Sequence, residues 1–461
     1  MPDFTSHFTR YGRGVLIALA VIVCAGFLLR AWVVVNPLAE PGDDALAYRA
    51  LAESLYEDGT YGGPEFKTPS DWSPGAPLIY AASYYLTGGV RDGVARGVEA
   101  LFGTAAILLA FLLTSRLLGP PGRPGARRAA GPLAAAALVA VYPPFIHSTG
   151  ALMSEPPAIF MLPASVLAFL WADRRMNQAA DPWGKAWPWL VPGLGFGLTA
   201  LIRPEYLAVC VVFGIFLLIR AFLHVGALRA ICATAAFGFA VLIPIIPWTI
   251  HNQHELGRVV PISTGSGKAL FTGTYYPGDG EYQRVKAELL YQQTGRRLDP
   301  DSKELEKVNP TPLFTQVADD YKAEHDLPDL DRDAALGRLG KENFKKYFGD
   351  DPLGYAGMTV RKVWRMWGTG IGEALSSPVG ALIQKLLVLA GLAGLILLAW
   401  RRRWEAIAVG LPLITVTGVA ALTLAPPRRN EILMMLVLPL AGVALDALLN
   451  RASPNAETEN R

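Results

Sequence analysis

The fold of this chain is decided by residues 15–61, where a long apolar run leads into a short acidic helix. Residues 15–35 read VLIALAVIVCAGFLLRAWVVV, which is long and apolar enough to cross the ~30 Å hydrocarbon core of a bilayer. Residues 41–61 read PGDDALAYRALAESLYEDGTY and open with the adjacent acids Asp43 and Asp44. Apolar residues then recur at helical spacing up to Asp58-Gly59, on a side formed by Leu46, Ala50, Leu51 and Leu55.

The pair Asp43 and Asp44 therefore lies at the start of an amphipathic helix just outside a membrane span. One alternative is that Asp43 only caps the helix, which is a common use of aspartate. A cap needs no second acid beside it, and two adjacent like charges repel. We therefore interpret the pair as a functional acidic site.

The composition is that of a polytopic membrane protein. Of 461 residues, 52% are hydrophobic and only 18% are charged, and the net charge of +3 is too small to indicate a nucleic-acid partner. The cysteines lie inside apolar runs, so they predict neither a disulfide framework nor a metal cluster. The first run has about 20 residues and lacks a clear small-residue cleavage site, so we expect a retained span.

The predicted fold is mainly α, a transmembrane bundle of about ten spans with re-entrant or interfacial helices. Residues 1–250 form an N-terminal membrane domain with a first outer loop over 36–92, 379–450 form the C-terminal spans, and 451–461 form a disordered tail. The candidate spans are 15–35, 93–117, 131–147, 156–172, 188–202, 205–222, 230–250, 379–400, 405–424 and 431–449.

Lysine and arginine in the short loops predict the orientation. With the N-terminus in the cytoplasm, the basic loops fall inside, provided that the short run 75–90 is interfacial or re-entrant and does not span. Unusual polar residues near span ends then gather on the extracytoplasmic face, where ionisable groups at membrane depth usually mark a site.

The segment 251–378 is the one sizeable extramembrane piece. Its first part is rich in Ser, Thr and Gly, which predicts short strands and turns, and its later part is charged and helical, so we expect a small mixed α/β segment. Residues 355–368 predict an interfacial helix in which Trp364 and Trp367 anchor to the headgroups.

Several loops, taken in order, resemble a known family. They are Asp43-Asp44-Ala45-Leu46-Ala47-Tyr48, the Pro-rich Trp72–Leu78, Tyr142-Pro143-Pro144 with Met153-Ser154-Glu155-Pro156, Leu201–Glu205, Asn252 with Gly257-Arg258, and the Arg-rich turn before the last span. Over about residues 15–450 this order resembles the GT-C superfamily of integral-membrane glycosyltransferases, in particular bacterial proteins similar to protein O-mannosyltransferases and lipid A aminoarabinose transferases. That family often has Asp-Glu where this chain has Asp-Asp, which leaves open which acid is the base.

The resemblance implies transfer of a sugar from a polyprenyl-phosphate donor to an acceptor hydroxyl on a glycan, lipid or protein, at the extracytoplasmic face of the cell membrane. The phosphate leaves with its lipid, so such a reaction needs a base for the acceptor and positive charge for the phosphate. Asp43 is the expected base, with Asp44 orienting the acceptor or sharing the role, and one direct displacement would invert the anomeric carbon.

Glu155 is the third acidic candidate. An acid at a helix N-terminus beside Pro156 also suits the helix dipole, which is the plainer explanation. Together with Asp43 and Asp44 it could bind Mg²⁺ or Mn²⁺, because these ions prefer carboxylate oxygens.

The candidate phosphate ligands are Arg203, Arg428 and Arg429, since a guanidinium matches phosphate oxygens in a fork. Arg203 could instead pair with Glu205, and Arg428 with Arg429 could simply anchor the last span. Weaker donor-binding candidates, each with a plain packing or solvated-loop alternative, are Tyr48, Arg258 and Lys268.

Two other classes remain open: a transporter or flippase for lipid-linked glycans, and a non-catalytic assembly subunit with the same fold. A transporter is expected to carry charges in mid-span and to show two matching halves. The sequence shows no such halves, and its unusual charges gather at one face, which favours the transferase.

Overall fold

The computed structural model describes residues 11–38, 42–62, 69–119, 129–178, 181–370, 375 and 377–451. In this part of the chain every regular element is a helix, which confirms the mainly α fold. The chain divides into two compact units, which we call unit 1 (Met1–Ile262, Gly370–Ile414 and Glu431–Arg461) and unit 2 (Ser263–Thr369 and Thr415–Asn430). Of the predicted tail 451–461, Arg451 is the last residue of a helix, and residues 452–461 lie outside the described residues.

Among the described residues, eight helices are long and apolar enough to cross a membrane, so the chain is a multi-pass membrane protein. They are α2 (Arg13–Val35), α5 (Asp92–Leu118), α8 (Glu155–Gln178), α11 (Tyr206–Val225), α12 (Ala227–Leu256), α20 (Pro378–Trp400), α21 (Glu405–Leu422) and α22 (Arg428–Arg451). A ninth candidate is bent by 51° between α6 (Ala130–Val141) and the segment Pro143–Gly150, which contains α7 (Pro143–His147) and η3 (Ser148–Gly150).

Two predicted spans therefore differ from the structure. The run 131–147 is broken, because Tyr142 leaves the helical conformation before Pro143 and Pro144. The run 188–202 becomes η4 (Trp187–Trp189) and α10 (Leu190–Ile202), preceded by the short α9 (Pro182–Ala186). At 13 residues, α10 is about 20 Å long, too short to cross the bilayer core alone.

The break after α6 is held by an arginine from the first span. Pro143 and Pro144 have no N–H, so the carbonyls of Val139 and Ala140 lose their partners in the helix. The guanidinium of Arg30 replaces both, with Nη2 3.1 Å from Val139 O and Nη1 3.1 Å from Ala140 O. Arg30 is fully buried, so this charged side chain serves as a cap inside the bundle.

Glycines allow the helices of unit 1 to approach closely. A Cβ on Gly193 or Gly197 of α10 would clash with carbonyl oxygens of α12, and one on Gly195 would clash with Ser165 of α8. These glycines are therefore packing positions between helices.

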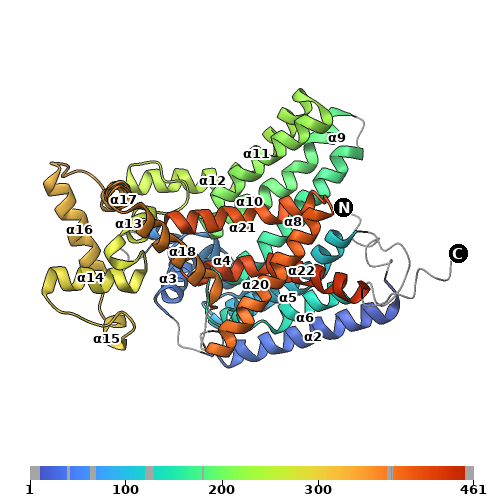
Figure 1. Cartoon of the computed structure of the whole chain (residues 1–461), viewed down its shortest axis with the longest axis horizontal. Helices are drawn as coiled ribbons and strands as arrows, with labels where there is room; N and C mark the ends of the chain where they lie inside the picture. The colour runs from blue at the N-terminus through green and yellow to red at the C-terminus, as the bar shows by residue number, and fades with distance from the viewer. Residues whose placement is uncertain are drawn as a thin grey trace. The chain divides into compact units, whose positions relative to one another are not determined.

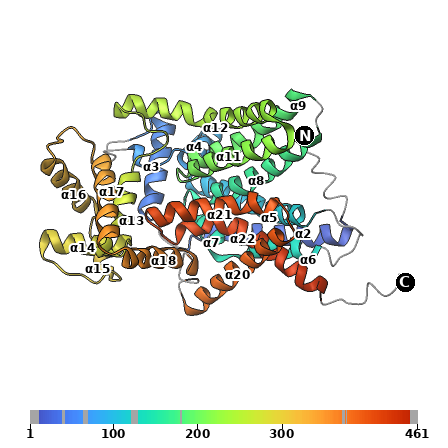
Figure 2. The same cartoon turned by 45° about the horizontal axis from the view of Figure 1, so that its top comes forward.

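Unit 2 is built from short helices around its own core. They are α13 (Ser266–Thr274), η5 (Tyr276–Gly278), α14 (Tyr282–Thr294), α15 (Lys303–Glu306), α16 (Thr311–Glu324), α17 (Arg332–Asp350) and α18 (Pro352–Gly368). The yellow-to-orange helices α13, α14, α16 and α17 gather together in Figure 1 and Figure 2. Their core contains Phe271, Val285, Leu289, Phe314 and Leu336.

The predicted strands in this segment are wrong: within the described residues it contains helices only. The small residues that indicated turns serve instead as close helix contacts. A Cβ on Gly267 of α13 would clash with the backbone at Asp333 and Gly337, and one on Gly340 of α17 would clash with the backbone of Phe271. The threonine hydroxyls of α13 bond to carbonyls one turn back, as Thr272 does to Lys268 O.

The two tryptophans of α18 differ in their surroundings. Trp364 is 65% exposed, as a headgroup anchor would be. The Nε1 of Trp367, however, donates to Thr417 Oγ1 at 3.2 Å within unit 2. Trp367 therefore packs against the protein, and of the predicted pair only Trp364 is available as an anchor.

Candidate functional site

The acid pair lies on the helix α3 (Asp43–Glu57), which begins where the sequence predicts. Gly42 occupies the N-cap position, so Asp43 is the first helical residue and the capping alternative does not apply. The side chain of Asp43 lies outside the described residues. Asp44 is half-buried, and Trp72 Nε1 donates to its Oδ1 at 3.5 Å.

The buried face of α3 differs in part from the prediction. Leu46 is 51% exposed, whereas the face toward the core carries Ala45, Tyr48, Leu51 and Ala52. Tyr48 lies one turn beyond Asp44 and packs with Tyr80 and Tyr84 of α4 (Gly75–Thr87), with Ala95 and with Leu152. At 13 residues, α4 is about 20 Å long, which agrees with the expectation that it does not span.

The Ser154-Glu155 loop and the Arg203 turn meet beside Tyr48. The hydroxyls of Tyr48 and Ser154 are 3.4 Å apart, and Arg203 Nη1 lies 3.1 Å from Ser154 Oγ and 3.5 Å from Glu155 Oε1. The Nε of Arg203 also lies 3.2 Å from Glu205 Oε1, so the predicted pairing with Glu205 is confirmed. The charge of Glu155, only 1% exposed, is thus balanced by an arginine that contacts two carboxylates.

The Pro-rich segment forms the next part of this end of unit 1. Ser73 Oγ donates to Ile202 O at 2.6 Å, and a Cβ on Gly75 would lie 2.6 Å from the Cα of Ile202. Ser70 Oγ donates to Asn252 Oδ1 at 3.0 Å. The side-chain amide of Asn252 in turn donates to Val260 O and Ile262 O. The motifs around Asp44, Trp72, Ser154, Arg203 and Asn252 therefore converge, although they are far apart in sequence.

The remaining predicted residues are placed differently. Arg258 follows α12 in unit 1 and is half-exposed. Lys268 belongs to α13 of unit 2, where its Nζ lies 4.6 Å from the ring centre of Phe314 and 5.5 Å from that of Tyr282. Its contacts are those of a cation–π pair within unit 2, which accounts for Lys268 without a ligand.

Arg428 and Arg429 begin α22 and belong to unit 2. Arg429 Nη1 donates to Thr423 Oγ1 at 2.9 Å, and the next residue, Asn430, donates to Thr369 O at 2.8 Å and also contacts Met366 O. This turn is therefore tied to the end of α18.

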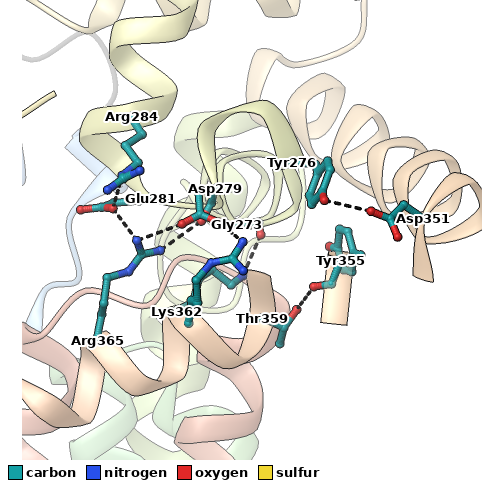
Figure 3. Close-up of polar contacts among 11 residues, drawn as sticks. Gly273, Tyr276, Asp279, Glu281, Arg284, Asp351, Tyr355, Thr359, Lys362 and Arg365 are labelled. Atoms are coloured by element: carbon teal, nitrogen blue, oxygen red, sulfur yellow. Dashed lines mark hydrogen bonds and ion pairs between the residues drawn. The ribbon is translucent and has the colours of Figure 1, made fainter. Parts of the chain in front are cut away.

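A buried lysine lies beside the same turn. Lys362 Nζ donates to Gly273 O at 2.7 Å and to Thr423 O at 2.9 Å, and the first of these contacts is drawn in Figure 3. Burial, together with the charges of Arg429 and Arg365, lowers the pKa of Lys362 to about 8. Positive charge is therefore concentrated around the turn of Arg429.

Asp279 and Glu281 balance part of this charge (Figure 3). Arg365 Nη1 lies 3.0 Å from Asp279 Oδ2 and 2.9 Å from Glu281 Oε2, and Arg361 Nη2 lies 2.7 Å from Asp279 Oδ1. Although partial burial opposes ionisation, the two arginines lower the pKa of Asp279.

Sequence reasoning missed several buried or partly buried charges in unit 1. Glu99 and Arg30 lie inside predicted spans, and that position was a usable signal, because ionisable residues at membrane depth are costly. At the opposite ends of α5 and α8 from Glu99 and Glu155, Arg116 pairs with Glu405 at 3.1 Å and Arg220 pairs with Asp173 at 2.6 Å. The idea that unusual charges gather at one face is therefore incomplete.

The side chains that the structure describes include no group of three or more His, Cys, Asp or Glu residues placed to hold a metal ion. The predicted set of Asp43, Asp44 and Glu155 depends on a side chain outside this description. Glu155 is already engaged by Arg203, so the two described carboxylates do not by themselves form the oxygen-rich site that Mg²⁺ prefers.

Comparison with known proteins finds a match in structure only. No family model and no curated protein sequence matches the chain. Its structure is similar to that of the archaeal oligosaccharyltransferase AglB from Archaeoglobus fulgidus in complex with an inhibitory peptide and a dolichol phosphate, with a TM-score of 0.54 and 14% identity over 95% of this chain and 51% of AglB. A structure of the Archaeoglobus fulgidus oligosaccharyltransferase in complex with Zn and sulfate gives a TM-score of 0.52 and 15% identity over 94% of this chain and 49% of that protein.

ArnT from Cupriavidus metallidurans bound to undecaprenyl phosphate also matches, with a TM-score of 0.34 and 14% identity over 95% of this chain and 78% of ArnT. The likeness to AglB shows a shared fold, which agrees with the fold that the resemblance found in the sequence implies. The chain spans about half the length of AglB.

Proposed function

We propose that the chain is a membrane glycosyltransferase that moves a sugar from a polyprenyl-phosphate carrier to an acceptor hydroxyl. The observation that supports this most is the convergence of α3, the Ser154-Glu155 loop and the Arg203 turn at one end of unit 1. The fold adds support, because AglB has been captured with a dolichol phosphate and a peptide. Both ligands belong to that protein, and we extend their chemical class, lipid phosphate and acceptor, to this chain as part of the proposal.

In the proposed reaction the acceptor oxygen attacks the anomeric carbon of the sugar. The new carbon–oxygen bond forms as the bond between that carbon and the phosphate oxygen breaks, and the electron pair leaves with the lipid phosphate. The acceptor proton passes to the carboxylate of Asp43, our proposed base, while Asp44, held by Trp72, orients the acceptor. One displacement inverts the anomeric configuration.

The residues around this pair have supporting roles in the proposal. Arg203 is shared between two carboxylates, Glu155 and Glu205, so we assign it to orienting the loop. We keep Arg428 and Arg429 as the proposed ligands of the donor phosphate. We place the reaction at the extracytoplasmic face of the cell membrane, as the loop charges predict. We assign no step to a divalent cation, because the described carboxylates do not complete a site for one.

The test uses the full chain in lipid nanodiscs with synthetic polyprenyl-phosphate sugars and hydroxyl acceptors. We expect a glycosylated product whose anomeric configuration is the reverse of the donor's, as determined by NMR, and none from nucleotide sugars. Movement of the intact lipid-linked sugar between the leaflets of proteoliposomes, with no glycosylated product from any donor, would favour the transporter alternative instead.

A further inference from the structure

A buried carboxylate that the proposed reaction does not use lies directly behind the Ser154-Glu155 loop. Glu99 of α5 is fully buried, as is Tyr80 of α4. Glu99 Oε1 accepts from Met153 N at 2.8 Å, and Oε2 accepts from Leu152 N at 3.3 Å. The hydroxyl of Tyr80 lies 2.6 Å from Glu99 Oε1 and 2.6 Å from Met153 O.

These contacts hold the peptide backbone in an unusual conformation. Leu152 has φ of 52°, in the left-handed region that a residue with a Cβ adopts only at a cost. Ala151, with φ of −107° and ψ of 0°, precedes it, and this combination turns successive N–H groups toward one point, as in an anion-binding nest. The carboxylate of Glu99 occupies that point, and Tyr80 contacts both it and the Met153 carbonyl.

We propose that Glu99, assisted by Tyr80, is a positioning residue that fixes the loop so that Ser154 and Glu155 reach Arg203 and Tyr48. We call the contacts of Glu99 and Tyr80 with the backbone of Leu152 and Met153 the clamp. The expected effect on the rate rests on the proposed function, whereas the clamp itself does not. The residue after the clamped peptide is Ser154, whose hydroxyl contacts both Tyr48 and Arg203. A loop released from Glu99 would relax Leu152 out of the left-handed region and move these groups.

The chemistry of the clamp explains why a carboxylate is required. Two backbone N–H groups point at two different oxygens, so both atoms must be acceptors. In Glu99→Gln one of the two becomes an NH₂ group, which faces an N–H in either orientation of the amide. Burial raises the pKa of Tyr80 well above its usual value, as does the charge of Glu99, so the hydroxyl remains a donor at neutral pH.

The experiment compares Glu99→Gln and the milder Tyr80→Phe with wild type in nanodiscs. A matched control is Glu53→Gln, which removes a partly exposed carboxylate that pairs with Arg49 on α3. We expect kcat to fall about 10- to 100-fold in Glu99→Gln and less in Tyr80→Phe, because small misplacements of reacting groups can cost about 10² in rate. KM for the donor should change less than about threefold, and the control should stay near wild type.

A second readout does not depend on activity. In a background without the three native cysteines, Met153→Cys reports on loop opening through its rate of reaction with a soluble maleimide. We expect Glu99→Gln to raise this rate at least about tenfold and Glu53→Gln to leave it unchanged.

An unchanged maleimide rate in Glu99→Gln would refute the clamp, and a raised rate with wild-type turnover would refute the positioning role. If the wild-type chain transfers no sugar, the proposed function fails, and the maleimide rate alone then decides whether Glu99 holds the loop.

Discussion

At the scale of single residues, positive charge around Arg429 decides how a donor phosphate would be held. Each guanidinium there would stabilise the phosphate more as the glycosidic bond breaks and its charge grows. Arg428→Ala or Arg429→Ala should therefore cost about 2–4 kcal/mol of transition-state stabilisation, comparable with the loss of one oxyanion-hole donor. The matching lysine variants should recover only part of it, because an ammonium lacks the fork.

Turnover and donor affinity of these four variants, measured with a synthetic polyprenyl-phosphate sugar, check this expectation. If both alanine variants turn over normally, the arginines only anchor the last span, and Arg203 becomes the next candidate.

Lys362 gives unit 2 a pH-dependent stability. Its folded pKa of about 8 lies below its ordinary value of 10.5, so between these values the unfolded chain binds more protons than the folded one. Stability should therefore rise with pH across this window, by roughly 1–3 kcal/mol, since one pKa unit corresponds to about 1.4 kcal/mol.

The melting temperatures of wild type and Lys362→Met at pH 7.5 and 9.5 test this expectation. Wild type should gain stability relative to the variant at the higher pH. A constant difference between the two proteins would show that Lys362 is not held with a lowered pKa.

At the scale of elements, Arg30 compensates for the two prolines after α6 by donating to the carbonyls that these prolines leave without an N–H partner. Arg30→Leu should leave the carbonyls of Val139 and Ala140 unpaired, at about 1–3 kcal/mol each. Arg13→Leu, at the exposed start of the same helix, is the control. Replacing Pro143 and Pro144 by alanine restores two N–H donors, so this double replacement should recover part of the loss caused by Arg30→Leu.

Denaturant unfolding of the single, double and combined variants gives the coupling energy. A strictly additive result would mean that Arg30 does not substitute for the missing proline donors.

The elements also show what the sequence could predict. Helix α3 begins at Asp43 because the preceding residue, Gly42, has an extended backbone and serves as the N-cap. The acid pair at this position could be recognised from the sequence of a single loop. The exposed position of Leu46 was not, because helical spacing defines a face only to within about one residue.

The strands expected around residues 258–280 failed for a related reason. Gly267 is a signal of a turn in isolation, but here it allows two helices to touch, which depends on a partner more than 60 residues away. The clamp at Glu99 could be suspected from its place in a span, but its backbone partners could not be named before folding.

At the scale of the whole molecule, the account depends on the ends of helices in unit 1 sharing one face. Arg203 contacts Glu155, so α10 returns the chain to the end at which α8 begins, and Ser70 contacts Asn252 at the end of α12. We expect cysteines at Asp58 and Gln253 to react with an impermeant thiol reagent in intact cells, and one at Ala227 only after permeabilisation. Gln253 is chosen because it is exposed, whereas Asn252 is fully buried.

The background for this labelling lacks the native cysteines. Labelling of Ala227→Cys from outside, with Gln253→Cys protected, would invert the topology and place the candidate site in the cytoplasm.

Substitution of the proposed base, Asp43, tests the proposed glycosyl transfer most directly. Asp43→Asn keeps the shape of the side chain at the first position of α3 but removes the proton acceptor, so turnover with a polyprenyl-phosphate sugar should fall about 10²- to 10⁴-fold. Asp58→Asn, which changes an exposed carboxylate at the far end of the same helix, should stay near wild type, and both variants should unfold at nearly the wild-type temperature.

The decisive measurement is therefore the turnover of Asp43→Asn against Asp58→Asn under saturating donor. The account predicts a loss in the first variant alone. Wild-type turnover in Asp43→Asn would contradict the assignment of the base, and a comparable loss confined to Asp44→Asn would move the base by one residue.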